Sequence, residues 1–207
     1  IDQKGVGLFP GVGGSIKLVK NKPLHLKWNG SRNFRMPTLN DLYWLPGGND
    51  ALMPETGYCG DIGLSSNLVS NRKRTNSKII NKLTFQAVSF YSLISNWILW
   101  TPNGQNWSPR NVKKVQKSGL EFSLNLSHTV NSIRGSKNLG LSLSYTLVEN
   151  TVLESTLIGD KGIGKSLLFV PKHCFKYKID YQIKDWIIIA GQGLTGRVFL
   201  DAANQSY

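Results

Sequence analysis

Strict alternation of apolar and polar residues is the sequence feature that most limits how this chain can fold. From Phe175 to Ile183, every second residue is apolar and the residues between are polar. Successive side chains of a β-strand point to opposite faces of its sheet, so this period gives one apolar and one polar face. The pattern occupies the ranges 24–28, 120–126, 139–147 and 175–183. No comparable segment keeps apolar residues at helical spacing, and we therefore predict an all-β fold.

The length and polar composition of these segments favour strands that cross a membrane. Several run for about ten residues or more, whereas soluble strands average about 5–6 and a strand tilted across a bilayer needs about 9–11. The polar positions are mostly small Ser, Asn and Thr, as a wet lumen requires. Aromatic residues gather toward strand ends, as in interfacial girdles: Tyr43, Trp44, Trp97, Trp100, Tyr145 and Trp186. A soluble β-sandwich with an aromatic core is the alternative.

The connections between strands alternate between short and long. Ranges 21–23 and 184–185 have the composition of tight hairpin turns, and 71–77 and 131–137 are short polar links. Longer loops are expected at 37–57, 101–110 and 153–171. Short turns at one end and long loops at the other are typical of outer-membrane barrels. We predict an antiparallel transmembrane β-barrel segment of about eight strands, with no second domain.

The net charge of +13 raises the alternative of a nucleic-acid partner. Much of the excess, however, falls in short runs at expected turns, such as 20–22, 72–74 and 113–114. In the range 175–181, alternation separates the aromatic residues from Lys176 and Lys178, whereas a stacking groove needs both kinds on one face. We therefore expect solvated charge on connecting segments and no nucleic-acid binding.

The segment Gly159–Ser166 matches the spacing of a phosphate-binding loop. Such a loop needs a helix directly after it, because the helix N-terminus supplies the amides that hold the phosphates. Here an apolar run follows and ends at Pro171. We therefore predict a mobile outer loop and not a nucleotide site.

Nothing in the sequence forms a catalytic or metal-binding pattern. The twelve carboxylates are mostly isolated, and no serine lies in a nucleophile elbow. The two cysteines and three histidines share no metal-ligand spacing; they are Cys59, Cys174, His25, His128 and His173. No run approaches the roughly 18 apolar residues of a transmembrane helix. We expect no enzymatic activity, no metal and no cofactor.

Several motifs follow one another in a distinctive order. The first runs from Ser31 to Trp44 as SRNFRMPTLNDLYW, and PGGNDALMPETG follows at 46–57. Further motifs are ISNWILWTP at 94–102, WSPRNV at 107–112, GLE at 119–121 and LFVPKH at 168–173. Together they resemble the C-terminal barrel of TonB-dependent outer-membrane receptors, of the vitamin B12 and iron–siderophore type found in Bacteroidetes.

This resemblance implies a place, a partner and a solute. Residues 1–207 would form part of a large antiparallel barrel in the Gram-negative outer membrane, with the plug domain and final strand or strands outside this range. The receptor would take up a large, scarce nutrient, either vitamin B12 or a ferric siderophore. Uptake would be energised by the TonB complex through N-terminal parts outside this range.

Outer-loop residues are the expected ligand contacts. Aromatic and amide groups suited to a bulky solute at a barrel mouth are Tyr43, Trp44, Asn49, Asp50, Trp100, Asn106 and Trp107. In the alternative, the Trp and Tyr side chains only hold the barrel at the membrane interface. The alternative function for the whole chain is a soluble all-β carbohydrate-binding module.

Overall fold

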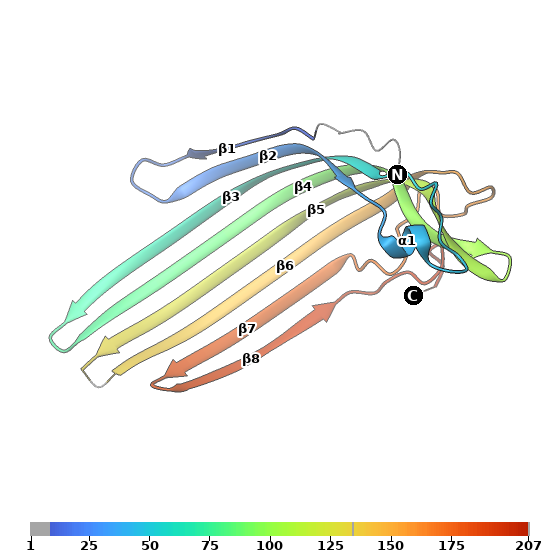
Figure 1. Ribbon diagram of the computed structural model, residues 1–207. Coiled ribbons are helices and arrows are strands. Elements are labelled where there is room, and N and C mark those ends of the chain that lie inside the picture. The colour runs from blue at the N-terminus through green and yellow to red at the C-terminus, as the bar shows by residue number, and fades with distance from the viewer. Residues whose placement is uncertain (1–8, 134, 207) are drawn as a thin grey trace.

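A single antiparallel sheet forms almost the whole of the computed structural model (Figure 1). The structure describes residues 9–133 and 135–206. In chain order the elements are β1 (Gly11–Lys17), β2 (Leu24–Arg35), α1 (Leu39–Tyr43), β3 (Glu55–Arg74), β4 (Ser77–Asn103), β5 (Asn106–Ser132), β6 (Gly135–Ser155), β7 (His173–Ile183) and β8 (Trp186–Thr195). The prediction of an all-β fold of about eight strands is confirmed.

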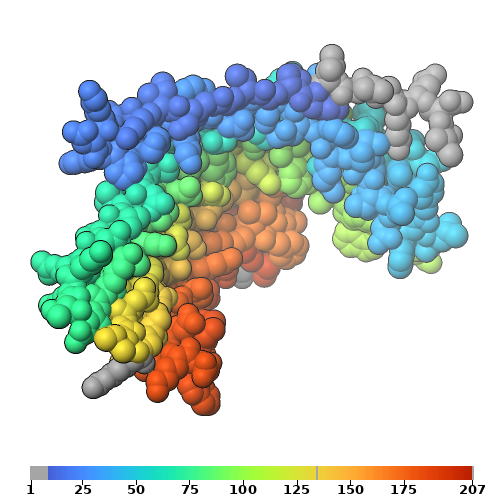
Figure 2. All heavy atoms as spheres, turned by 60° about the vertical axis from the view of Figure 1, so that its left-hand side comes forward, coloured from blue at the N-terminus to red at the C-terminus, as the bar shows by residue number. Residues whose placement is uncertain are grey.

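The strands follow one another across the sheet in chain order, from β1 to β8. The C-terminal ends of β1, β3, β5 and β7 lie at one end of the sheet, which we call the turn end; α1 and the longer connections lie at the other, the loop end (Figure 1). The sheet curves into an arch (Figure 2). Within the described residues, β1 and β8 do not pair with each other, so the sheet is an open section of a barrel wall.

One expected loop is instead a continuation of two strands. The range 101–110 was expected to be a long loop, but β4 and β5 each run for 27 residues and only 104–105 separates them. Gly104 is the first of the two central residues of this turn and has the positive φ (64°) that the position requires. Beyond the point where β3 stops pairing with β4 at Ser95, residues 96–103 and 106–112 form a two-stranded projection, which we call the arm.

The two faces of the sheet differ sharply in polarity. One cross-strand row joins Leu26, Leu64, Ala87, Phe122, Tyr145, Phe175 and Leu194, from β2 to β8. The adjacent row on the opposite face joins Ser65, Gln86, Ser123, Ser144, Lys176 and Gly193. In the apolar row, Phe122 and Leu194 are exposed at 40% and 51%, because no second layer of the described chain covers them. A bilayer outside and a wet lumen inside match these two faces.

Buried hydrophobic side chains gather at the loop end. Leu42, Leu52 and Ile98 form one cluster, which packs the segment around α1 against β4. Val115, Val152 and Leu167 form another, which packs the segment after β6 against β5 and β6. No helix among the described residues is long and apolar enough to cross a membrane. The two clusters thus pack the long connections against the strands.

Candidate functional site

All the predicted ligand residues lie at the loop end. Tyr43 ends α1, Trp44 and the range 49–50 follow it, and Trp100, Asn106 and Trp107 belong to the arm. The segment 36–54 and the arm are in contact, so the structure brings together two parts of the chain that lie about 60 residues apart. The site is therefore a folded platform built from one loop and one hairpin.

Local sequence explains why α1 forms. Thr38 and Asp41 make a capping box, in which each side chain binds the backbone N–H of the other. The Asp41 N–H donates to Thr38 Oγ1 at 3.1 Å, and the Thr38 N–H donates to Asp41 Oδ2 at 2.9 Å. The indole N–H of Trp100 donates to the other carboxylate oxygen of Asp41 at 2.9 Å. Asp41 thus fixes the helix start and ties it to the arm.

The charge of Asp41 is held by its surroundings. Burial would raise the pKa of this carboxyl group, but hydrogen bonds from Thr38 and Trp100, with the charge of Arg35, outweigh burial and lower the pKa below its ordinary value. Asp41 is therefore ionised at neutral pH and accepts every hydrogen bond aimed at it.

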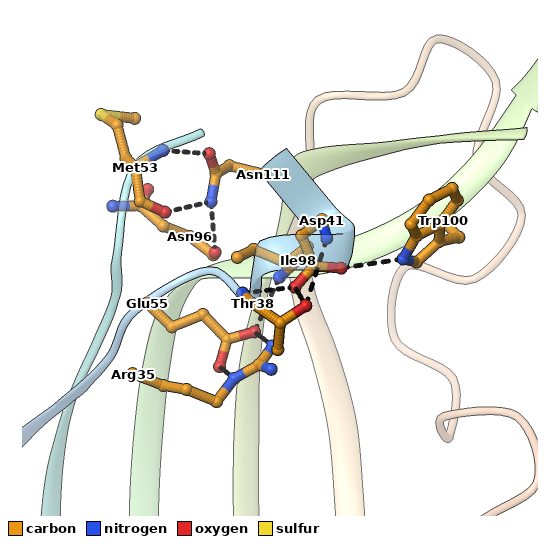
Figure 3. Close-up of polar contacts among 9 residues, drawn as sticks. All are labelled: Arg35, Thr38, Asp41, Met53, Glu55, Asn96, Ile98, Trp100 and Asn111. Atoms are coloured by element: carbon orange, nitrogen blue, oxygen red, sulfur yellow. Dashed lines mark hydrogen bonds and ion pairs between the residues drawn. The ribbon is translucent and has the colours of Figure 1, made fainter. Parts of the chain in front are cut away.

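Glu55 makes the second connection between the loop and the arm. Its buried carboxylate accepts from Arg35 Nε at 2.7 Å and Nη2 at 2.5 Å, in a bidentate pair (Figure 3). The backbone N–H of Ile98 donates to the same carboxylate at 2.8 Å. Arg35 ends β2 and Glu55 begins β3, so this pair closes the base of segment 36–54. It also supplies an acceptor to a backbone group in the irregular part of β4.

Asn111 holds the backbone in place where the pairing of β4 with β5 is irregular. The pairing of β4 with β5 shifts between Ile94 and Ile98, and Asn96 adopts a positive φ of 58°. The Asn111 amide donates to Asn96 O and to Met53 O, both at 2.8 Å, and its oxygen accepts the Met53 N–H at 2.8 Å. We call the set Arg35, Asp41, Glu55, Trp100 and Asn111 the loop clamp (Figure 3).

The loop and the arm also meet through close backbone approach. A Cβ at Gly47 would lie 2.0 Å from the carbonyl oxygen of Trp107, so only glycine fits there. The Asn49 amide donates to Pro109 O at 3.0 Å, and its oxygen accepts the Ala51 N–H at 3.0 Å. Among the predicted contacts, Asn49 and Trp100 are therefore committed to internal hydrogen bonds.

The other predicted contacts remain available at the surface. Tyr43, Trp44 and Trp107 are exposed at 65%, 56% and 59%, which is high for such large apolar side chains. Asp50 and Asn106 are also exposed. The platform thus offers aromatic faces with polar groups beside them, a combination that suits a large amphipathic solute.

The second long connection, 156–172, is held by a buried ion pair. Lys113 Nζ lies 3.2 Å from Asp160 Oδ2, and both side chains are more than nine-tenths buried. Ser155 Oγ donates to Asp160 at 2.6 Å, and the Gly162 N–H donates at 2.8 Å. Burial would raise the pKa of Asp160, but these hydrogen bonds and Lys113 lower it below its ordinary value.

This arrangement accounts for the glycine-rich run Gly159–Ser166. Gly159 and Gly164 both have φ of 74°, and the Gly164 N–H donates to Val152 O at 2.8 Å. Within the described residues no helix follows the run, so the amides that a phosphate site needs are not arranged there. The run is a series of turns folded onto the end of β6.

All five residues of the loop clamp belong to the sequence motifs, but the sequence alone assigned a role only to Trp100, as a ligand contact. The Thr-x-x-Asp spacing at 38–41 was a visible signal, because it is a helix-start pattern. The partners of Glu55 and Asn111 lie up to 58 residues away in the chain. A single sequence carries no local signal for such pairs.

Comparisons with known proteins agree with this geometry. The protein-family model for "TonB dependent receptor-like, beta-barrel" matches residues 2–207. The vitamin B12 transporter BtuB of Photobacterium profundum is 25% identical over 186 residues, which cover 87% of this chain and 26% of that protein. The vitamin B12 transporter BtuB of Vibrio vulnificus is 30% identical over 91 residues, covering 43% of this chain and 13% of that protein. The chain thus matches about a quarter or less of these relatives.

Proposed function

Because this chain belongs to the TonB-dependent receptor-like β-barrel family, we propose that it forms part of the wall and mouth of a receptor that takes up cobalamin. The family places the barrel in the Gram-negative outer membrane. The observation that carries the proposal is the similarity to two vitamin B12 transporters. Ferric siderophores are the competing solute class.

The geometry supports a role for each part of the chain. The apolar face meets lipid, the polar face lines the lumen, and the loop-end platform receives the solute. Tyr43, Trp44 and Trp107 would contact its apolar surface, while Asp50 and Asn106 would supply polar contacts. The loop clamp would keep these groups in place before the solute arrives, which reduces the entropy lost on binding.

Transport in this proposal is driven by the inner-membrane TonB system. TonB would act through a plug domain and N-terminal segment outside residues 1–207. The chain's own contribution is then binding and wall structure and not catalysis.

The test is uptake of labelled cyanocobalamin by cells that lack their own cobalamin receptor and carry the intact receptor containing this chain. The test compares such cells with and without TonB. We expect cobalamin to bind at the surface of both, and to be taken up only by the cells that have TonB. An excess of a ferric siderophore should leave binding unchanged. Binding of the siderophore without binding of cobalamin would overturn the proposed solute, and uptake without TonB would overturn the proposed energy source.

The alternative of a soluble carbohydrate-binding module has less support. A soluble β-sandwich buries the inner faces of two packed sheets. In the part of the chain that the structure describes, one sheet stands alone, with large apolar side chains such as Ile62, Leu68 and Ile188 exposed at 52%, 44% and 60%. A free protein with this surface would aggregate in water.

A further inference from the structure

A groove crosses the lipid-facing side of the sheet near the turn end. It has a volume of about 550 Å³ and spans β3 to β6. Most of its outward-facing lining is aliphatic: Leu68, Leu83, Leu126, Leu139 and Leu141. A hydrocarbon chain is the complement of such a lining.

A polar pair interrupts this otherwise apolar surface. His128 Nδ1 lies 2.6 Å from Asn81 Oδ1, and both residues line the groove on the lipid-facing side. Because the Asn81 oxygen only accepts, the ring N–H at Nδ1 is the donor. Within the described residues, the Asn81 amide N–H groups and the second ring nitrogen of His128 make no other hydrogen bond. Polar side chains on a lipid-facing surface are costly unless they have a polar partner there.

Two cations flank this pair. In the cross-strand register, Ser70, Asn81, His128 and Leu139 lie opposite one another in one row. Arg72 is two residues beyond Ser70, and Lys137 is two residues before Leu139, so alternation puts both on the same face one row nearer the turn end. Arg72 is thus a diagonal neighbour of Asn81, and Lys137 is a diagonal neighbour of His128. Diagonal neighbours on adjacent strands lie about 7–8 Å apart. Both are exposed, and neither makes an ion pair within the described part of the chain.

We propose that this groove binds an anionic phospholipid with a hydroxylated headgroup, of the phosphatidylglycerol class. An acyl chain lies along the leucines, and the phosphate sits between Arg72 and Lys137, where the Asn81 amide donates to it. The second ring nitrogen of His128 accepts a hydrogen bond from a hydroxyl group of the headgroup. A zwitterionic phosphatidylethanolamine places its ammonium against the same two cations and binds less well. The inference depends on the sheet facing lipid and not on which solute the receptor carries.

The turn end is the periplasmic end in this architecture, because short turns lie on the periplasmic side of outer-membrane barrels. Trp186, exposed at 74%, follows the last turn at the same end, as an interfacial aromatic does. The groove therefore faces the phospholipids of the inner leaflet.

The experiment titrates the intact, detergent-purified receptor with phosphatidylglycerol or phosphatidylethanolamine of identical acyl chains and counts bound lipids by native mass spectrometry. We expect tighter binding of phosphatidylglycerol. The double variant Arg72→Gln, Lys137→Gln should weaken that binding about tenfold, since each cation near an anionic lipid contributes appreciably. Leu139→Trp, which fills the groove from an exposed position, should weaken it as well.

The matched control is Lys20→Gln, Lys22→Gln, which removes the same charge from the turn between β1 and β2. It should leave phosphatidylglycerol binding unchanged. Equal binding of the two lipids, or equal loss in the control, would overturn the lipid site. Cobalamin binding is measured on the same samples: a receptor that binds cobalamin without preferring phosphatidylglycerol refutes this inference alone, and the reverse result refutes only the proposed solute.

Discussion

Removing the Glu55 carboxylate should release the base of the arm. Glu55 is 6% exposed and accepts hydrogen bonds from the Arg35 guanidinium and from the Ile98 N–H. In Glu55→Ala the Ile98 N–H becomes a buried donor without an acceptor, at a cost of about 1–3 kcal/mol. The Arg35 side chain is 50% exposed, so water replaces most of its lost pairing and that contribution is about 1 kcal/mol.

Together these losses amount to about 3 kcal/mol of local stability, or roughly a 100-fold increase in the population of the open arm. Glu55→Gln keeps the shape and an acceptor for Ile98, so we expect only about a tenfold increase. Hydrogen–deuterium exchange at the Ile98 amide in the intact receptor measures both values. The control is Glu154→Ala, because the Glu154 side chain is 70% exposed in its pair with Lys114 and should contribute almost nothing.

The relative exchange rates of Glu55→Ala and Glu55→Gln separate the effect of the lost charge from that of the lost acceptor. If Glu55→Ala exchanges no faster than the unaltered receptor at Ile98, the carboxylate does not hold the arm. If Glu55→Gln is as severe as Glu55→Ala, loss of charge and not the orphaned Ile98 amide is responsible.

Four further predictions concern residues at the loop end. Trp100→Phe keeps the ring but loses the hydrogen bond to Asp41, and should speed exchange in segment 36–54 about tenfold; unchanged exchange would contradict the role of this bond. Because the pKa of Asp41 is lowered in the folded chain, its contribution is complete above the ordinary Asp value and lost as pH falls through the lowered one, so protection of that segment should fall only below about pH 4. Asp160→Asn should leave the buried Lys113 charge without its partner carboxylate, which loosens the connection 156–172. Trypsin cleavage within 156–172 should accelerate several-fold, with no effect on cleavage elsewhere. Trp44→Ala should weaken cobalamin binding about fivefold without changing the melting temperature; a fall in melting temperature would show that Trp44 is structural.

Alternation predicted strands correctly where one face meets lipid, and it lost its signal where strands pack against folded loops instead. The ranges 139–147 and 175–183 lie inside β6 and β7. The start of β5 and the end of β4 lie in the arm, where no lipid selects an apolar side, and the range 101–110 there was expected to be a loop. The same effect shortened the strand expected at 24–28, since β2 continues to Arg35.

The candidate site could be located from the sequence but not assembled from it. Aromatic residues such as Tyr43 and Trp107 were visible as groups near expected loops, and the structure puts them on one platform. Which of them are free depended on partners distant in the chain. Trp100 donates a hydrogen bond to Asp41, and Asn49 donates one to the carbonyl oxygen of Pro109. These pairs form only when segment 36–54 folds against the arm.

The neighbour-by-neighbour pairing of β1 to β8 also makes the sheet modular. Every pairing closes only the connection between two consecutive strands, so the loop-closure entropy of each step is small and independent of the others. A hairpin can therefore be added to or removed from such a wall without changing the register of the remaining strands. Adding or removing one hairpin at the edge of the sheet would therefore change its width and leave the contacts between segment 36–54 and the arm in place.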